Sequence, residues 1–288
     1  MSRALDHIVH AVRDLDAVAG LYRRLGFTVG ARNRHPWGTH NHVVQLPGFF
    51  IELLTLAEPE KLGDDAISVN FGAFHRDFLA KHEGLSMLLL ASNDAAADAG
   101  AFAQAGIASS QATRFDREGR RPDGSLVKLA FSLVFARDPT APDLGCAVCQ
   151  HHYPENFWSP AFQQHANGVT GVLGVALVAD DPAVHADFLR GYSGAEIVSS
   201  PGRISATAPR GEIIVVEPAR YRDEFNLDTK NVSRGTQFAA IRFAARDLDA
   251  ASDLLNANAI KATRIGERVV IGPDAAMGAA FIIEPTGR

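Results

Sequence analysis

The chain has 288 residues, of which 47% are apolar and 21% are charged, and its formal net charge is −5. This balance is typical of a globular protein with an apolar core, and the absence of any block of Lys and Arg argues against nucleic acid as a partner. Residues 1–7 contain no apolar secretory segment, and apolar runs such as residues 87–91 are too short to cross a membrane. We therefore expect a cytoplasmic protein with no nucleic-acid or membrane partner.

Four segments of the chain repeat one pattern, which is the most informative feature of the sequence. Residues 5–27 align with residues 85–107 without a gap. The pentapeptide RDLDA of residues 13–17 recurs at residues 246–250, and a further copy starts at Val172. The chain is therefore expected to contain four copies of one small structural unit.

Within each copy, the pattern predicts a strand, a helix and then three further strands. An apolar run of about seven residues suits a buried strand. The Asp that follows, such as Asp14, suits a helix N-cap because its carboxylate accepts hydrogen bonds from free backbone N–H groups. The next stretch is amphipathic, and Gly26 and Gly106 predict where the first two helices end. In the first copy, β-like runs follow at residues 27–29, 40–46 and 49–56.

One such unit leaves a sheet face uncovered, so the units are expected to pair. We predict an α+β protein in which four βαβββ modules form two mixed-sheet domains. The N-terminal domain spans residues 1–160, with modules at 4–56 and 85–152, and the C-terminal domain spans residues 161–288, with modules at 168–217 and 236–285. Residues 57–83 and 218–235 are expected to be polar connectors.

Paired units of this kind, with an Asp-Leu pair and a Tyr-containing helix that ends at Leu25-Gly26-Phe27, resemble the vicinal oxygen chelate superfamily. That superfamily includes glyoxalase I, extradiol dioxygenases and bleomycin resistance proteins. In the N-terminal half, residues 38–41 (GTHN) and the strand at residues 49–53 are similar to glyoxalase-like domain proteins. The resemblance implies that each pair of modules curls into a cup around a divalent metal ion.

The resemblance also implies metal ligands on the first and last strands of a module. In the first module these positions hold His7 and Glu52, an imidazole and a carboxylate that suit Zn, Fe, Mn, Co or Ni. In the second module Met87 takes the place of His7, and Gln150 takes the place of Glu52, with His152 on the same strand face. The expected site is His7, Glu52 and either Gln150 or His152, completed by water. No organic cofactor is expected.

Other side chains are candidates for substrate binding. His40 and His42 share one face of a predicted strand and Asn41 points to the other, so either the two histidines or Asn41 would face the cup. Arg34 could bind a carboxylate and Trp158 could form an aromatic wall. The alternative is that the three strand residues and Arg34 are ordinary surface or hydrogen-bonded residues and that Trp158 is part of the core.

Two groups are expected to have no chemistry. Cys146 and Cys149 lie three apart on a predicted strand and point to opposite faces, so they should not share a metal ion or a disulfide. In the C-terminal half, Gly174 and Ala240 stand where a first-strand ligand would be needed. This half is therefore expected to be a degenerate glyoxalase-like domain that acts as a structural partner or a lid.

Two functions remain open. The first is a metal-dependent lyase or isomerase that acts on a small, oxygen-rich substrate in the N-terminal cup, with Glu52 as ligand and catalytic base. The second is a metal-free protein that binds a small molecule without changing it, as sequestering or resistance proteins do. The sequence favours the enzyme slightly, because of His7, Glu52 and the concentration of histidines before residue 169. A third, purely structural role is disfavoured, since it leaves an acidic residue in the apolar strand 49–54 buried without a role. The sequence leaves open whether two chains associate as a homodimer.

Overall fold

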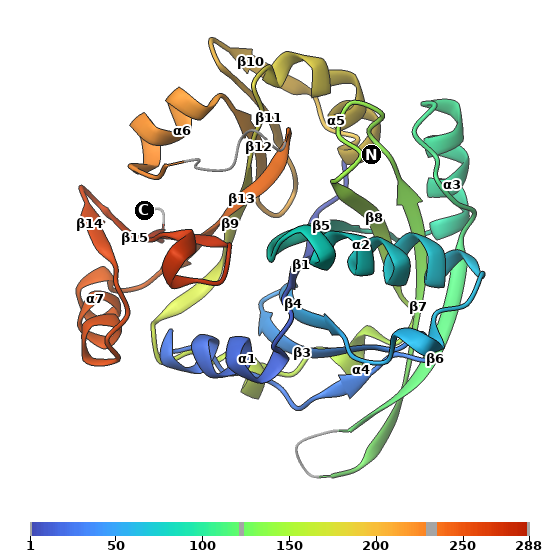
Figure 1. Cartoon of the computed structure of the whole chain (residues 1–288), viewed down its shortest axis with the longest axis horizontal. Coiled ribbons are helices and arrows are strands. Elements are labelled where there is room, and N and C mark those ends of the chain that lie inside the picture. Colours follow the sequence, from blue (N-terminus) through green and yellow to red (C-terminus); the bar gives the residue numbers. More distant parts are fainter. Residues whose placement is uncertain (1, 121–123, 229–234, 287–288) are drawn as a thin grey trace.

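The structure is a computed structural model that describes residues 2–120, 124–228 and 235–286. The described residues form two eight-stranded sheets, one in each half of the chain (Figure 1). The first sheet contains β1 (Leu5–Ala11), β2 (Asn33–Arg34), β3 (Thr39–Leu46), β4 (Phe49–Leu56), β5 (Gly84–Ala91), β6 (Thr113–Arg120), β7 (Leu126–Ala136) and β8 (Gly145–His151). The second contains β9 (Val169–Val178), β10 (Ile197–Ser200), β11 (Arg203–Thr207), β12 (Glu212–Val216), β13 (Gln237–Ala245), β14 (Thr263–Ile265), β15 (Arg268–Ile271) and β16 (Ala280–Pro285).

The two sheets have the same topology, as four copies of one module require. The strand orders are β2-β3-β4-β1-β5-β8-β7-β6 and β10-β11-β12-β9-β13-β16-β15-β14. In each module the first strand pairs in parallel with the last, and two modules join through their antiparallel first strands, β1 with β5 and β9 with β13. The predicted α+β fold of paired βαβββ modules is therefore confirmed. The domain boundary at residue 160 stays a prediction, and it falls between β8 and β9.

Each module has a helix after its first strand, and other helices lie in the connections. The helices are α1 (Leu15–Arg24), α2 (Phe74–Lys81), α3 (Ala95–Gln104), α4 (Pro154–Phe157), α5 (Ala186–Ser193), α6 (Pro218–Phe225) and α7 (Leu248–Ala257). Short turns of other helix types are η1 (Pro59–Lys61), η2 (Ser68–Ala73), η3 (Pro160–Gln163), η4 (Pro182–His185) and η6 (Pro273–Ala275). The Asp before each module's helical segment is the N-cap, as predicted, and accepts backbone N–H bonds in all four copies: Asp14, Asp94, Asp181 and Asp247.

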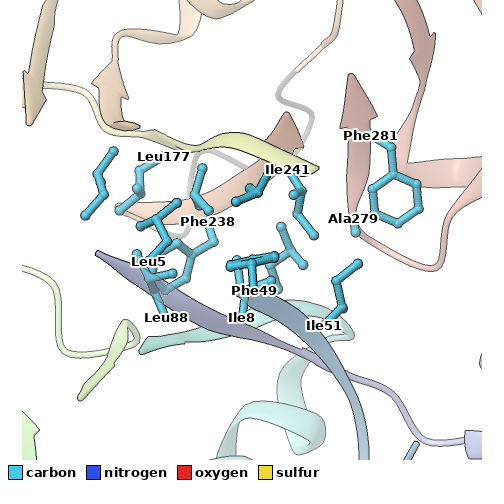
Figure 2. Close-up of a cluster of buried hydrophobic side chains, with 14 of the residues drawn as sticks. Leu5, Ile8, Phe49, Ile51, Leu88, Leu177, Phe238, Ile241, Ala279 and Phe281 are labelled. Carbon is cyan, nitrogen blue, oxygen red and sulfur yellow. The ribbon is translucent and has the colours of Figure 1, made fainter. Parts of the chain in front are cut away.

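The two sheets pack against each other through the faces that also carry the module helices, which we call the outer faces. Their side chains form one apolar core that runs through both halves. Figure 2 shows its centre, where residues of the first sheet meet residues of the second: Leu5, Ile8, Phe49, Ile51 and Leu88 against Leu177, Phe238, Ile241, Ala279 and Phe281. Burying such a face is the main stabilising term for a sheet. It leaves the opposite face of each sheet, which we call the cup face, for other contacts.

Hydrogen bonds across the core hold the two halves in register. The Tyr192 hydroxyl lies 2.6 Å from the Leu88 carbonyl oxygen and 3.0 Å from the Ala147 carbonyl oxygen. The ring of His10 contacts the Tyr22 hydroxyl at 3.0 Å through Nδ1 and the Met277 carbonyl oxygen at 2.9 Å through Nε2. Both groups are fully buried, so these bonds satisfy polar atoms that water cannot reach.

The two connectors are not simply polar, which differs from our expectation. In the first connector, η2 and α2 bury Phe71 and Phe78 against the cup side of the first sheet, and α2 runs across that sheet in Figure 1. In the second, Tyr221 and Phe225 of α6 are buried in the cup face of the second sheet. In both connectors the aromatic residues recur at a helical spacing, so that one face of the helix is buried. The charged residues between them made these segments look uniformly polar in the sequence. In the described residues, no helix is long and apolar enough to cross a membrane.

Buried neutral histidines predict that stability falls in mild acid. Burial lowers the pKa of His10 to about 4 and that of His75 to about 4, from an ordinary value of 6.5. Between these values the unfolded chain binds more protons than the folded chain, so the free energy of unfolding falls as the pH drops from 6.5 towards 4. Each histidine contributes at most about 1.4 kcal/mol per pH unit.

Urea unfolding of the wild type and of His10→Gln and His75→Gln at several pH values measures this effect. Each substitution should make the pH dependence shallower. Variants whose pH dependence is as steep as that of the wild type would contradict the assignment.

Candidate functional site

A small cavity lies on the cup face of the first sheet. Its volume is about 50 Å³, and its walls are largely aromatic. The sheet curls so far that its two edges meet across the cup: the rings of Trp37, which follows β2, and Phe115 on β6 are 5.0 Å apart. The polar side chains that line the cavity are His7, His35, Asn41, Glu52 and Arg117.

His7 and Glu52 face each other in this cavity. They come from the neighbouring parallel strands β1 and β4, and both are about 5% exposed. His7 Nε2 lies 4.0 Å from Glu52 Oε2. The imidazole also stacks on Phe50, with ring centroids 4.1 Å apart, which fixes the plane of the ring. The pair that the family resemblance implied is thus brought to one point, because alternation along β1 and β4 puts both side chains on the cup face.

A bulge in β1 adds a second carboxylate beside His7. The pairing of β1 with β5 shifts between Leu5 and His7, so Asp6 is an extra residue and does not simply alternate away from His7. Asp6 Oδ2 lies 2.6 Å from His7 Nδ1, and the same carboxylate contacts His151 Nε2. Burial alone would raise the pKa of Asp6, but the charges and hydrogen bonds of His151 and His7 hold it well below its usual range. The Asp6 carboxylate therefore accepts the Nδ1–H hydrogen bond of His7 and orients the ring, so that Nε2 is directed at Glu52.

Two amides hold the other side of Glu52. Asn41 Nδ2 donates to Glu52 Oε1 at 2.5 Å, and Asn33 Nδ2 donates to Asn41 Oδ1 at 3.1 Å. Burial raises the pKa of Glu52 and outweighs the lowering effects of His7, Asn41 and Arg117. One carboxylate oxygen is thus fixed by a donor, while the other faces His7.

His35 approaches the same carboxylate from a second direction. Its Nε2 lies 3.9 Å from Glu52 Oε1, its Nδ1 contacts Thr39 Oγ1 at 2.8 Å, and its ring stacks on Trp37. Burial lowers the pKa of His35 to about 3, so its ring is neutral. Among the described residues, the possible ligand atoms of His7, Glu52 and His35 do not all lie within 4.8 Å of one another.

The possible ligand atoms of Asp6, His7 and Cys149 do lie within 4.8 Å of one another. However, both Asp6 oxygens already contact histidines. Burial, together with the charges of Asp6 and Glu52, raises the pKa of the Cys149 thiol, and the thiolate is the form that binds metal. The chemistry of these donors makes Asp6 and Cys149 poorer ligands than the pair His7 and Glu52.

The structure does not bring Gln150 or His152 to this pair. The strand register pairs Val9 with Glu52 and Leu89 with Ala147, so Ala147 is the counterpart of Glu52, and Gln150 lies three residues further on. Gln150 instead bonds the N-terminal end of α3, where its Oε1 accepts from Ala95 N. His152 contacts Ser132 Oγ at 2.8 Å and does not line the cavity. The counterpart of Glu52 was placed three residues too late, because the pairing of β8 with β5 sets the register and a single sequence does not specify it.

Among the predicted substrate-binding residues, the cavity contains Asn41. His40 contacts Glu58 Oε2, and His42 Nδ1 contacts the Gly30 carbonyl oxygen, both on the opposite face of β3. Arg34 is exposed on β2. Trp158 does not line the cavity but stacks on His151, the second partner of Asp6. The alternative that the sequence left open for β3 is thus resolved in favour of Asn41.

Among the described residues, the cup of the second sheet contains no comparable pair of imidazole and carboxylate. Arg242 lies there between two carboxylates, 2.6 Å from Glu284 and 3.1 Å from Glu212, and Tyr221 and Phe225 fill the adjacent space. These ion pairs satisfy the charges internally. This is in keeping with the degenerate character expected of the C-terminal half.

Sequence reasoning missed Asp6, His35 and Arg117. Asp6 was overlooked because simple alternation puts it opposite His7, and a single sequence does not reveal the bulge. His35 and Arg117 belong to β2–β3 and β6, which meet only when the sheet closes. The sequence signal for Arg117 was its place two residues after Phe115, which puts both side chains on the same face of a strand within residues 113–120.

Comparisons with known proteins agree with this fold. Residues 5–192 match the family described as "Glyoxalase-like domain". No curated protein matches the sequence. A hypothetical protein from Staphylococcus aureus has a similar structure, with a TM-score of 0.70 and 12% identity over 98% of this chain and 99% of that one.

Two enzymes of known name are also similar in fold. A mutant of 4-hydroxymandelate synthase from Streptomyces coelicolor has a TM-score of 0.59 and 12% identity over 100% of this chain and 94% of that one. 2,2',3-Trihydroxybiphenyl 1,2-dioxygenase from Sphingomonas wittichii has a TM-score of 0.54 and 14% identity over 100% and 92%. At such identities the likeness concerns the fold alone. The family match covers well over half of the chain, and the chain therefore belongs to the glyoxalase-like domain family.

Proposed function

We propose that the N-terminal cup binds one divalent metal ion through His7 and Glu52 and catalyses a lyase or isomerase reaction on a small, oxygen-rich substrate. The observation that supports this most directly is the separation of 4.0 Å between His7 Nε2 and Glu52 Oε2. Nitrogen and oxygen ligands lie about 2.0–2.2 Å from zinc, so two of them are at most about 4.3 Å apart when they share an ion. The two groups are within reach of one ion.

The donor set fits such an ion. An imidazole with a carboxylate suits Zn, Fe, Mn, Co or Ni. The contact between His7 Nδ1 and Asp6 is the kind of support that metal-binding histidines usually have, because it fixes the tautomer and the ring. With His7 and Glu52 as ligands, the other coordination positions would be taken by water or substrate. A small movement of His35 would supply a third protein ligand.

When bound, the metal would act as a Lewis acid that polarises substrate oxygens. The protein's own contribution would be proton transfer by Glu52. Asn41 holds Oε1, and burial raises the pKa of the carboxyl, which brings its proton affinity closer to the neutral range where a general base works best. The aromatic walls would exclude water from this proton.

A second candidate function is metal-free binding of a small molecule. It is favoured by the second module: among the described residues, those that it contributes to the cavity lining include Leu89 and Cys149 but no imidazole or carboxylate. This alternative predicts that a chelator leaves ligand binding unchanged.

Metal analysis separates the two. Protein purified without a His-tag should contain about one divalent ion per chain, and His7→Gln and Glu52→Gln should each lose it, because one remaining ligand binds the ion too weakly. His42→Gln is a matched control, since His42 lies on the opposite strand face, and it should retain the metal. Metal-free wild type after exposure to each candidate ion would remove the enzyme proposal.

The ionisation of Glu52 gives a second prediction. Its pKa is raised in the folded state, so its contribution to stability is present below the unfolded value of 4.5 and is lost as the pH rises through the folded value. Glu52→Gln is neutral at every pH. In chelator-treated protein, its free energy of unfolding should therefore gain on that of the wild type from pH 5 to pH 8, measured with urea.

The exposed Glu60→Gln is the control and should follow the wild type at both pH values. If Glu52→Gln is less stable than the wild type at pH 8 by the same margin as at pH 5, the carboxylate is stabilised as an anion and the assignment is wrong.

A further inference from the structure

Arg117 introduces a positive charge into the cavity that the reaction proposed above does not use. The residue lies on β6 and lines the cavity, with its guanidinium carbon 5.7 Å from the centre of the Phe131 ring. An arginine stays charged in proteins, so taking it out of water is costly unless an anion accompanies it. The question is which anion this arginine meets.

In the described part of the chain, the guanidinium has few polar contacts. The contact of the guanidinium with Asn33 is long, at 3.4 Å between Nη1 and Oδ1, and its Nε is buried without a hydrogen-bond partner. Within the described residues, Arg117 forms no ion pair with a carboxylate, although Glu52 is close enough to interact electrostatically. By contrast, Arg242 in the second cup is paired with two glutamates.

A chain of two amides separates Arg117 from Glu52. Arg117 contacts Asn33, Asn33 donates to Asn41, and Asn41 donates to Glu52. These amides satisfy one another and hold the cationic group and the carboxylate apart. The cavity therefore has a cationic end at Arg117 and a reactive end at His7 and Glu52.

We propose that Arg117 determines substrate specificity by binding the carboxylate of a short-chain acid. The carbon next to that carboxylate carries a further oxygen atom, and this oxygen is the one that reacts at His7 and Glu52. The choice of a carboxylate follows from the planar guanidinium, which pairs with it through two parallel hydrogen bonds. This inference rests on the proposed function for the orientation of the substrate, but not for the binding of the anion.

The size of the cavity limits the acid to a short chain. A water molecule needs roughly 10–15 Å³ measured in this way, so a cavity of about 50 Å³ accepts a few such groups. Pyruvate is a suitable probe because it is small and carries vicinal oxygens. Pyruvamide is its neutral counterpart of nearly the same shape.

Calorimetry and ligand-observed NMR on chelator-treated protein test the proposal without relying on the metal. Wild type should bind pyruvate at least tenfold more tightly than pyruvamide, and Arg117→Gln should lose at least tenfold in pyruvate affinity with little change for pyruvamide. Arg117→Lys keeps the charge but not the planar pair and should fall between. Arg114→Gln is the control on the same strand, since Arg114 is exposed and paired with Asp116; it should bind as the wild type does.

Equal affinity of wild type and a folded Arg117→Gln for pyruvate would overturn the proposal, as would equal affinity of wild type for the two probes or no binding of pyruvate. Circular dichroism verifies that each variant is folded, and Arg117→Lys decides the matter if Arg117→Gln is not. Metal content provides the separation from the proposed function. Absence of metal in the wild type refutes that function alone, whereas unchanged pyruvate binding in a metal-containing Arg117→Gln refutes this inference alone.

Discussion

The burial of the two outer sheet faces against each other is the constraint on which the rest of the structure depends. Once Ile8 and Ile51 are committed to the shared core, strand alternation leaves His7 and Glu52 on the cup face, away from the partner sheet. The same packing acts on all four modules, so both halves form a cup. What differs between the cups is the side chains that face inward.

That difference explains why chemistry is assigned to one half. In the second cup, arginine and glutamate side chains neutralise one another and two aromatic residues of α6 occupy the space. In the first, polar groups are held by supports that leave functional atoms available: Asp6 holds His7 through Nδ1, and Asn41 holds one oxygen of Glu52. Polar groups that are held in place but keep an unpaired atom lower the stability of the folded protein, so they are expected where function requires them.

Much of the fold could be predicted because each level of the sequence agrees. The repeated apolar runs, the Asp N-caps and the pairing of modules all reappear in the structure. His7 and Glu52 could be named because the family resemblance marks these two positions, and alternation holds locally from His7 to Val9 and along β4. Asp6 could not, because a bulge breaks alternation, and neither could His35 and Arg117, because closure of the sheet between β2 and β6 is a long-range event. Gln150 was misplaced because strand register depends on pairing that local composition does not specify.

Anomalous diffraction from crystals grown with manganese or zinc tests the central claim most directly, because it locates the ion and its ligands together. The account predicts one strong peak in the N-terminal cup, within bonding distance of His7 Nε2 and a Glu52 oxygen, with Asp6 still bonded to Nδ1. A peak held by Asp6 and Cys149 instead, or a cup with no peak in metal-saturated crystals, would contradict it.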